Sequence, residues 1–134
     1  MEITSNAVFI KDSKVLFEKR REDEDNYAGL WALPGGHKRE KESPKKALIR
    51  EMKEELGVKI KEAKFIGRFE DIDPTSKKPY LHHYYLCSYE GRIKKTYEQK
   101  KLKWLKPDKI KKLKEKGKTS KSDIEVLKKF GILR

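Results

Sequence analysis

Three glutamates, Glu51, Glu54 and Glu55, gather within five positions of the segment GGHKREKESPKKALIREMKEELGV, which spans residues 35–58. Carboxylate oxygens are hard ligands of the kind that Mg²⁺ and Mn²⁺ prefer. A cation bound by such a group could support metal-assisted hydrolysis. A run of glutamates on a helix is also common as a plain solvated face, so the three residues alone leave both interpretations open.

A helix must position these glutamates. Ser43-Pro44 is typical of a helix start, because serine caps free backbone N–H groups and proline suits the first helical position. Gly57 is typical of a helix end. On a helix over 44–56 the glutamates share one flank, where like charges at this spacing cost about 0.2–0.5 kcal/mol for each pair. The apolar stripe beside that flank is predicted to consist of Leu48, Ile49, Met52 and Leu56.

Further elements are expected on both sides of this helix. A basic helix should begin at Pro107, and a last helix in SDIEVLKKFG should be capped by Ser122. Its apolar face would consist of Ile124, Leu127 and Phe130. Strands are predicted at 3–10, 14–20, 63–70, 80–89 and 102–105. With no internal repeat and no long linker, this order predicts one mixed α/β domain over residues 1–134.

The formal net charge of +13 is unevenly distributed. Residues 1–91 hold 18 Lys and Arg against 17 Asp and Glu, whereas residues 92–134 hold 17 against 5. The basic helical part, about 106–134, could bind a polyanion such as nucleic acid, or it could be a solvated lysine-rich surface. There is no apolar run of membrane-spanning length, no secretory signal pattern, and a single cysteine, Cys87. These features predict a cytoplasmic protein without membrane contact.

The spacing around the glutamates is more specific than the glutamates themselves. Residues 36–58 read G, five residues, E, seven residues, and then REMKEELGV. This pattern resembles the signature of the Nudix hydrolases, and every specified position is met. WALPGGH (31–37) resembles the entry to that motif, although Lys41 stands directly before Glu42, where many members have glycine. The resemblance implies an α/β/α sandwich with a mixed β-sheet.

The resemblance also implies an activity and a set of site residues. Nudix hydrolases cleave a nucleoside diphosphate linked to another group, and they need Mg²⁺ or Mn²⁺. Glu42 and Arg50 would form a supporting ion pair. The general base would be Glu51, Glu54 or Glu98. The metal ligands would be Glu51, Glu54, Glu55 and the backbone carbonyl of Gly35, where no side chain blocks the ion.

The substrate is less well defined. KRREDEDNYAGLWALPGGH and EQKKLKWL resemble the MutT-type nucleoside triphosphate pyrophosphohydrolases, whose substrates include oxidised nucleotides. Pro74, 16 residues past Val58, instead resembles a marker of ADP-ribose pyrophosphatases, and dinucleoside polyphosphates are a related alternative. A non-catalytic nucleotide sensor and an RNA-directed enzyme gripping RNA through the basic part also remain open. The protein is expected to be a monomer or homodimer. Candidate substrate contacts are Arg20, Tyr27, Trp31, Tyr80 and Tyr84.

Overall fold

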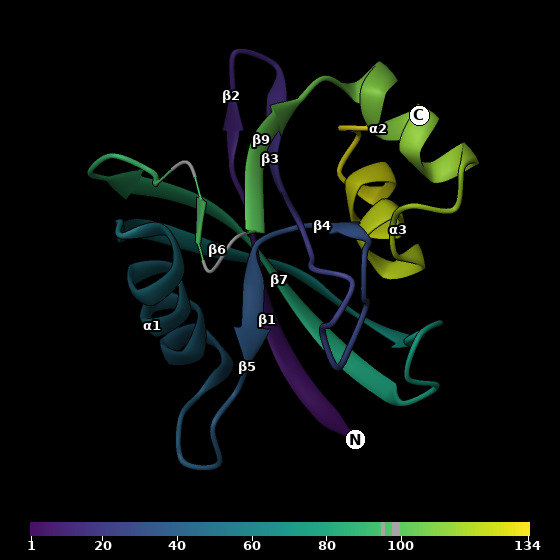
Figure 1. Ribbon diagram of the computed structural model, residues 1–134. Helices are drawn as coiled ribbons and strands as arrows, with labels where there is room; N and C mark the ends of the chain where they lie inside the picture. Colours follow the sequence, from purple (N-terminus) through teal and green to yellow (C-terminus); the bar gives the residue numbers. More distant parts are fainter. Residues whose placement is uncertain (95, 98–99) are drawn as a thin grey trace.

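The computed structural model of the chain describes residues 1–94, 96–97 and 100–134 (Figure 1). Glu98, a candidate base, lies outside the described residues. The helices are α1 (Pro44–Leu56), α2 (Pro107–Glu115) and α3 (Lys121–Lys129). The strands are β1 (Glu2–Val8), β2 (Ile10–Lys11), β3 (Lys14–Lys19), β4 (Trp31–Ala32), β5 (Gly35–His37), β6 (Lys59–Ile72), β7 (Pro79–Glu90), β8 (Thr96–Tyr97) and β9 (Lys100–Leu105). None of the helices in these described ranges is long and apolar enough to cross a membrane.

The strands form a mixed sheet and an antiparallel sheet. In the mixed sheet the order is β5-β1-β7-β6, with β1 parallel to β7 and the other neighbours antiparallel. In the antiparallel sheet the order is β2-β3-β9-β8, and β4 pairs with β3. The predicted strands at 63–70 and 80–89 belong to a longer hairpin, β6–β7. Its strands, of 14 and 12 residues, are the two longest of the mixed sheet.

Alternation at the end of β1 divides apolar side chains between two cores. Ala7 and Phe9 pack in one cluster with Leu48 of α1, whereas Val8 packs in the other with Leu127 of α3. Successive strand residues point to opposite faces, so α1 covers one face and α2 with α3 cover the other. Figure 1 shows the helices on opposite sides of the strands. The predicted α/β/α layering is confirmed.

The predicted boundaries of α1 are confirmed, with one error in its buried stripe. The Ser43 side chain accepts a hydrogen bond from the Lys46 N–H at 3.2 Å, and Gly57 ends the helix in the left-handed conformation with φ 74°. Ile49, however, is 42% exposed. Ala47 and Glu55 are buried instead, together with Leu48, Met52 and Leu56. The buried face of the helix therefore extends toward Ala47 and Glu55 rather than toward Ile49.

The start of α3 differs from the prediction. Ser120, not Ser122, caps the helix, and its side chain accepts from the Asp123 N–H at 3.2 Å. Ser122 is buried, and its hydroxyl oxygen lies 2.9 Å from the Tyr84 hydroxyl, within hydrogen-bond distance. Phe130 was expected on the buried face, but it lies past the helix end and is 39% exposed.

Tyr84 is a core residue, and its predicted contact with a nucleobase is wrong. Its side chain has no exposed surface, so a ligand cannot stack on it. Its hydroxyl lies 2.6 Å from Asp123 Oδ1 and donates to it. This bond joins β7 to α3, and the Leu33 N–H donates to the second Asp123 oxygen at 3.0 Å. Burial raises the pKa of Asp123 to about 6, so these donors are needed to stabilise its charge.

Tyr84→Phe should lower the free energy of unfolding by about 1–3 kcal/mol, because Asp123 loses a buried donor. Tyr89→Phe is the matched control: its half-buried ring packs edge-on against Phe9, and its loss of a hydroxyl should cost less than about 0.5 kcal/mol. Urea unfolding of both variants at neutral pH measures the difference. Equal effects of the two substitutions would contradict a structural role for the Tyr84–Asp123 bond.

Candidate active site

The glycines of β5 allow two close approaches. A Cβ at Gly36 would overlap the Glu51 carboxylate, with Glu51 Oε2 only 2.5 Å away, so glycine lets this side chain lie over the strand. A Cβ at Gly35 would collide with Asn6 and with the backbone oxygen of Ser5. The tight packing of β5 on β1 therefore requires glycine at position 35, a structural constraint that the sequence did not show.

Arg50 joins the acidic residues of the motif. Its guanidinium donates to both Glu42 oxygens, at 3.0 and 2.5 Å, which confirms the predicted ion pair. It also donates to Glu51 at 2.8 Å, to Glu54 at 3.2 Å and to the backbone oxygen of His37 at 3.1 Å. These bonds lower the pKa of Glu42 to about 2 and raise the pKa of Arg50. One cation thus offsets the repulsion along the helix flank and ties α1 to β5.

A cleft of about 430 Å³ lies between α1, β5 and β9, within the size range of small-molecule sites. Residues that line it include Arg20, Glu24, Gly36, Glu51, Glu55 and Lys100. The predicted site residues Gly35 and Tyr80 line it as well. Glu54 does not: it is 47% exposed at the rim, where Arg39 lies 3.9 Å away. Trp31 also lies outside the cleft and packs against the core beside α3.

The inner wall of the cleft carries buried charge. Glu55 and Glu18 are both nearly inaccessible, and burial together with their mutual repulsion raises the pKa of Glu55 to about 9. Burial raises the pKa of Glu18 to about 7, while Lys100 and Arg20 oppose both shifts. The Lys100 ammonium lies 3.9 Å from Glu55 Oε1 and 3.5 Å from Glu24 Oε1. Among the described residues, the buried side-chain atoms without a hydrogen-bond partner are Glu18 Oε2, Glu24 Oε1 and Glu55 Oε2.

These carboxylates fit a divalent cation in their chemistry. Buried anionic oxygens without donors are costly, and a hard cation would satisfy them. In the part of the chain that the structure describes, no three His, Cys, Asp or Glu side chains are arranged to hold a metal as they stand. Arg50 pairs with oxygens of both Glu51 and Glu54. A cation would have to compete with this guanidinium for them.

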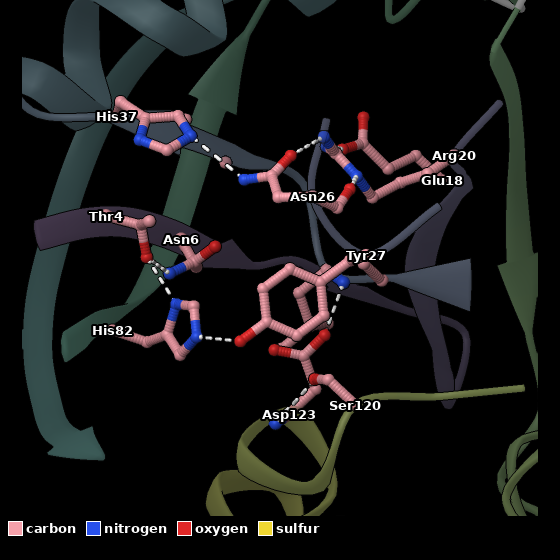
Figure 2. Close-up of a pocket in the computed structure, with 14 residues that line it drawn as sticks. Thr4, Asn6, Glu18, Arg20, Asn26, Tyr27, His37, His82, Ser120 and Asp123 are labelled. Carbon is pink, nitrogen blue, oxygen red and sulfur yellow. Dashed lines mark hydrogen bonds and ion pairs between the residues drawn. The ribbon is translucent and has the colours of Figure 1, made fainter. Parts of the chain in front are cut away.

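A smaller inner cavity adjoins the cleft (Figure 2). The His82 ring bridges the hydroxyls of Thr4 and Tyr27, at 2.5 and 2.8 Å, and the Tyr27 N–H donates to Asp73. Tyr27 was predicted to contact substrate, and it lines this cavity rather than the cleft. Burial lowers the pKa of His82 to about 4, which keeps the ring neutral. The Thr4, Tyr27 and His82 side of the cavity is therefore a hydrogen-bonded set of neutral side chains.

Comparison with known proteins identifies the family. The family model of the NUDIX domain matches residues 2–130. The chain belongs to the Nudix hydrolase family. Members of this family are pyrophosphohydrolases, so the protein is an enzyme that acts on phosphorus-containing anhydrides.

Curated relatives of this Nudix hydrolase carry related activities. The chain is 28% identical to the CTP pyrophosphohydrolase of Escherichia coli (strain K12), over 76% of the chain and 73% of that protein. It is 33% identical to the 8-oxo-dGTP diphosphatase of Buchnera aphidicola subsp. Schizaphis graminum, over 65% of the chain and 64% of that protein. Both alignments extend well beyond the 23-residue signature.

Solved structures agree with the fold. The E. coli ORF135 protein in solution superimposes with a TM-score of 0.75 and 25% identity, covering 97% of this chain and 88% of that one. The MutT NUDIX hydrolase from Burkholderia pseudomallei gives a TM-score of 0.70 and 26% identity, covering 80% and 84%. The mixed α/β architecture predicted for this Nudix hydrolase is therefore shared with these structures.

Sequence reasoning did not identify some polar residues of the Nudix site. Glu18 had a usable signal, because a single acid interrupts the apolar run KVLFEK of β3. Asp123 had a weaker one, since it follows a serine near a helix start. Lys100 had no signal in the sequence, because it stands among several lysines. In β9 it is buried, whereas Lys101 and Lys103 are exposed.

His82 should make the folded state sensitive to acid. Its pKa is about 4 when folded and about 6.5 when unfolded, mainly through burial, with His37 lowering it further and Asp73 opposing. Below pH 6.5 only the unfolded chain takes up this proton, so stability is lost as the pH falls toward 4, by up to about 3 kcal/mol.

Urea unfolding of wild type and His82→Gln between pH 4 and 7 isolates this contribution. Glu18 and Glu55 titrate in the opposite sense, but they are common to both proteins and cancel in the difference. The advantage of wild type over His82→Gln should shrink steadily as the pH falls. A difference that stays constant over this range would show that the buried histidine does not contribute.

Proposed function

We propose that this Nudix hydrolase is a Mg²⁺-dependent nucleoside triphosphate pyrophosphohydrolase that releases pyrophosphate from unmodified or oxidised nucleotides. The observation that carries the proposal is the cleft itself, where Glu51 and Glu55 of the complete signature face Arg20 and Lys100. Acidic residues suit a metal, and basic residues suit phosphate oxygens. The likeness to a CTP pyrophosphohydrolase and an 8-oxo-dGTP diphosphatase supports a triphosphate substrate.

Glu51, Glu54, Glu55 and the Gly35 carbonyl are the groups that would hold Mg²⁺ or Mn²⁺. When bound, the ion would neutralise charge on the phosphate oxygens and lower the pKa of water. The buried, donor-free Glu55 Oε2 is the strongest support for Glu55 as a principal ligand. Glu54 would reach a cation only after giving up its bond to Arg50, which its exposed position permits.

Glu51 is the better placed candidate for the general base. It lines the cleft, and Arg50 donates a hydrogen bond to one of its oxygens, which orients the carboxylate. Glu54 is less suited to this role, because its side chain is 47% exposed and does not line the cleft in which the attacking water would lie. Glu98 stays a further candidate, because it lies outside the described residues. Arg20 is proposed to contact phosphate, and Tyr80 to border the bound nucleotide from β7.

Pro74 does not require an ADP-ribose substrate. It belongs to the turn between β6 and β7, which the buried Asp73 organises. One Asp73 oxygen accepts from the Thr75 N–H and hydroxyl, both at 2.8 Å, and the other accepts from Ser76 and from the Tyr27 N–H. A proline after the capping aspartate suits such a turn. The marker-like spacing thus has a local structural cause.

Glu55→Gln should abolish metal response while preserving the fold. Burial already favours the protonated carboxyl, and glutamine resembles that form, so the melting temperature in EDTA should be unchanged or higher. Turnover should fall by roughly a hundredfold or more, and the rise in melting temperature on adding Mg²⁺ should vanish. Glu62→Gln, on the exposed side of β6, is the matched control. Full activity of Glu55→Gln would refute the metal assignment.

A substrate panel with Mg²⁺ or Mn²⁺ tests the substrate class. It should contain unmodified and oxidised nucleoside triphosphates, ADP-ribose, dinucleoside polyphosphates and capped RNA. The proposal requires that triphosphates give the highest kcat/KM and that pyrophosphate, not phosphate, is released. Preference for ADP-ribose or dinucleoside polyphosphates would replace the triphosphate assignment. Preference for RNA, with affinity that falls steeply with salt, would point to the basic part as a binding surface, and activity on none would favour a sensor.

A further inference from the structure

A groove lined with lysines lies between α2 and α3, the two helices on the face of the protein opposite α1 (Figure 1). Its volume is about 340 Å³, and its described lining residues include none that line the catalytic cleft. Ser120 lines both this groove and the inner cavity, but it is buried, and its hydroxyl caps α3. The groove is therefore a surface separate from the active site.

The helical repeat brings lysines from both helices to this groove. In α3, Lys121 and Lys128 are exposed and lie about two turns apart on the same flank. In α2, Lys114 lines the groove from the other side, and Lys111 is exposed about one turn before it. Ile124 contributes apolar surface to the groove. Two stripes of lysine, one from each helix, thus border one groove.

The positive charge of the groove is largely unbalanced. Glu125 is the one acid among its described lining residues. In the part of the chain that the structure describes, the ion pairs involve no lysine of α2 or α3. Proximity to Lys114 lowers the pKa of Lys128, and Lys111 lowers it further, whereas Glu125 opposes the shift. Ammonium groups gathered in this way suit a ligand that carries several negative charges.

We propose that this groove binds the phosphate backbone of a nucleic acid strand, independently of its base sequence. Lysine contacts with phosphate oxygens supply the affinity of such complexes. None of the described lining residues is aromatic, so they offer no ring on which a base could stack. Exposed lysines continue beyond the groove, at Lys118 and Lys129, and this extended positive surface favours a polymer over a small anion.

This role goes beyond the proposed hydrolysis and does not depend on it. The described residues that line the groove are absent from the cleft, so a strand held by α2 and α3 would leave the cleft free for a nucleotide. The strand would hold the enzyme on nucleic acid and would not supply the phosphate that reacts.

Lys114→Gln combined with Lys128→Gln should weaken binding of an oligouridylate of about 12 nucleotides by roughly tenfold or more near 0.1 M salt. Because two phosphate contacts are lost, the slope of log affinity against log salt should become shallower by about 1.4. Fluorescence anisotropy of the full-length protein measures both quantities. The probe carries a 5′-hydroxyl and a 3′-fluorophore, and EDTA is present, so that neither a triphosphate end nor a metal directs it to the cleft.

The matched control is Lys45→Gln combined with Lys64→Gln. These two exposed lysines line a different groove, between α1 and β6, so the control removes the same charge from the opposite face. It should change the affinity by less than about twofold and leave the salt slope as in wild type. The Lys114 and Lys128 side chains are exposed, so their double variant should melt no lower than wild type.

Equal losses of affinity in the two double variants would overturn the inference, because net charge alone would then account for binding. Absence of saturable binding by wild type would overturn it as well. Inorganic tripolyphosphate that binds the groove more tightly than the oligouridylate would reassign the site to small polyphosphates. The RNA measurement involves no hydrolysis, so each of these results leaves the proposed function to its own tests.

Discussion

Repulsion between neighbouring carboxylates is the constraint on which this active site depends. The motif places Glu51 and Glu55 one helical turn apart, and the fold then buries Glu55 against Glu18. In a low-dielectric interior such repulsion is far stronger than on a helix surface. Two cations from different parts of the chain offset it. Arg50 acts along the outer flank of α1, and Lys100 acts from β9 on the inner side.

The backbone is arranged to make this concentration of charge possible. β5 pairs with β1 closely enough that Gly35 has no room for a side chain, and Gly36 leaves space for the Glu51 carboxylate. Arg50 reaches the His37 carbonyl and so fastens the helix to that strand. The layered fold also positions the inner cavity. The sheet packs against α1 on one face, and on the other face Ser120 and Asp123 at the start of α3 line the cavity.

Local signals predicted what local interactions determine. The start and end of α1 follow from Ser43-Pro44 and Gly57, and the spacing of the motif was enough to indicate the family. Long-range contacts determined the rest. Tyr84 looked like an available aromatic, yet its burial depends on α3, 39 residues later in the chain. The inward turn of Lys100 depends on the pairing of β9 with β3, which no property of a lysine-rich segment reveals.

The charge distribution also fits an anionic substrate that arrives with a metal. The first 91 residues are nearly balanced, so the carboxylates of the cleft do not lie in a strongly acidic region. The excess positive charge lies mainly beyond residue 91, on β9, α2 and α3. Such a field attracts polyphosphate from a distance, while a neutral histidine and paired acids line the interior. At short range, the Lys100 ammonium, 3.5 Å from Glu24 and 3.9 Å from Glu55, offsets part of the negative charge that would repel the phosphates of such a substrate.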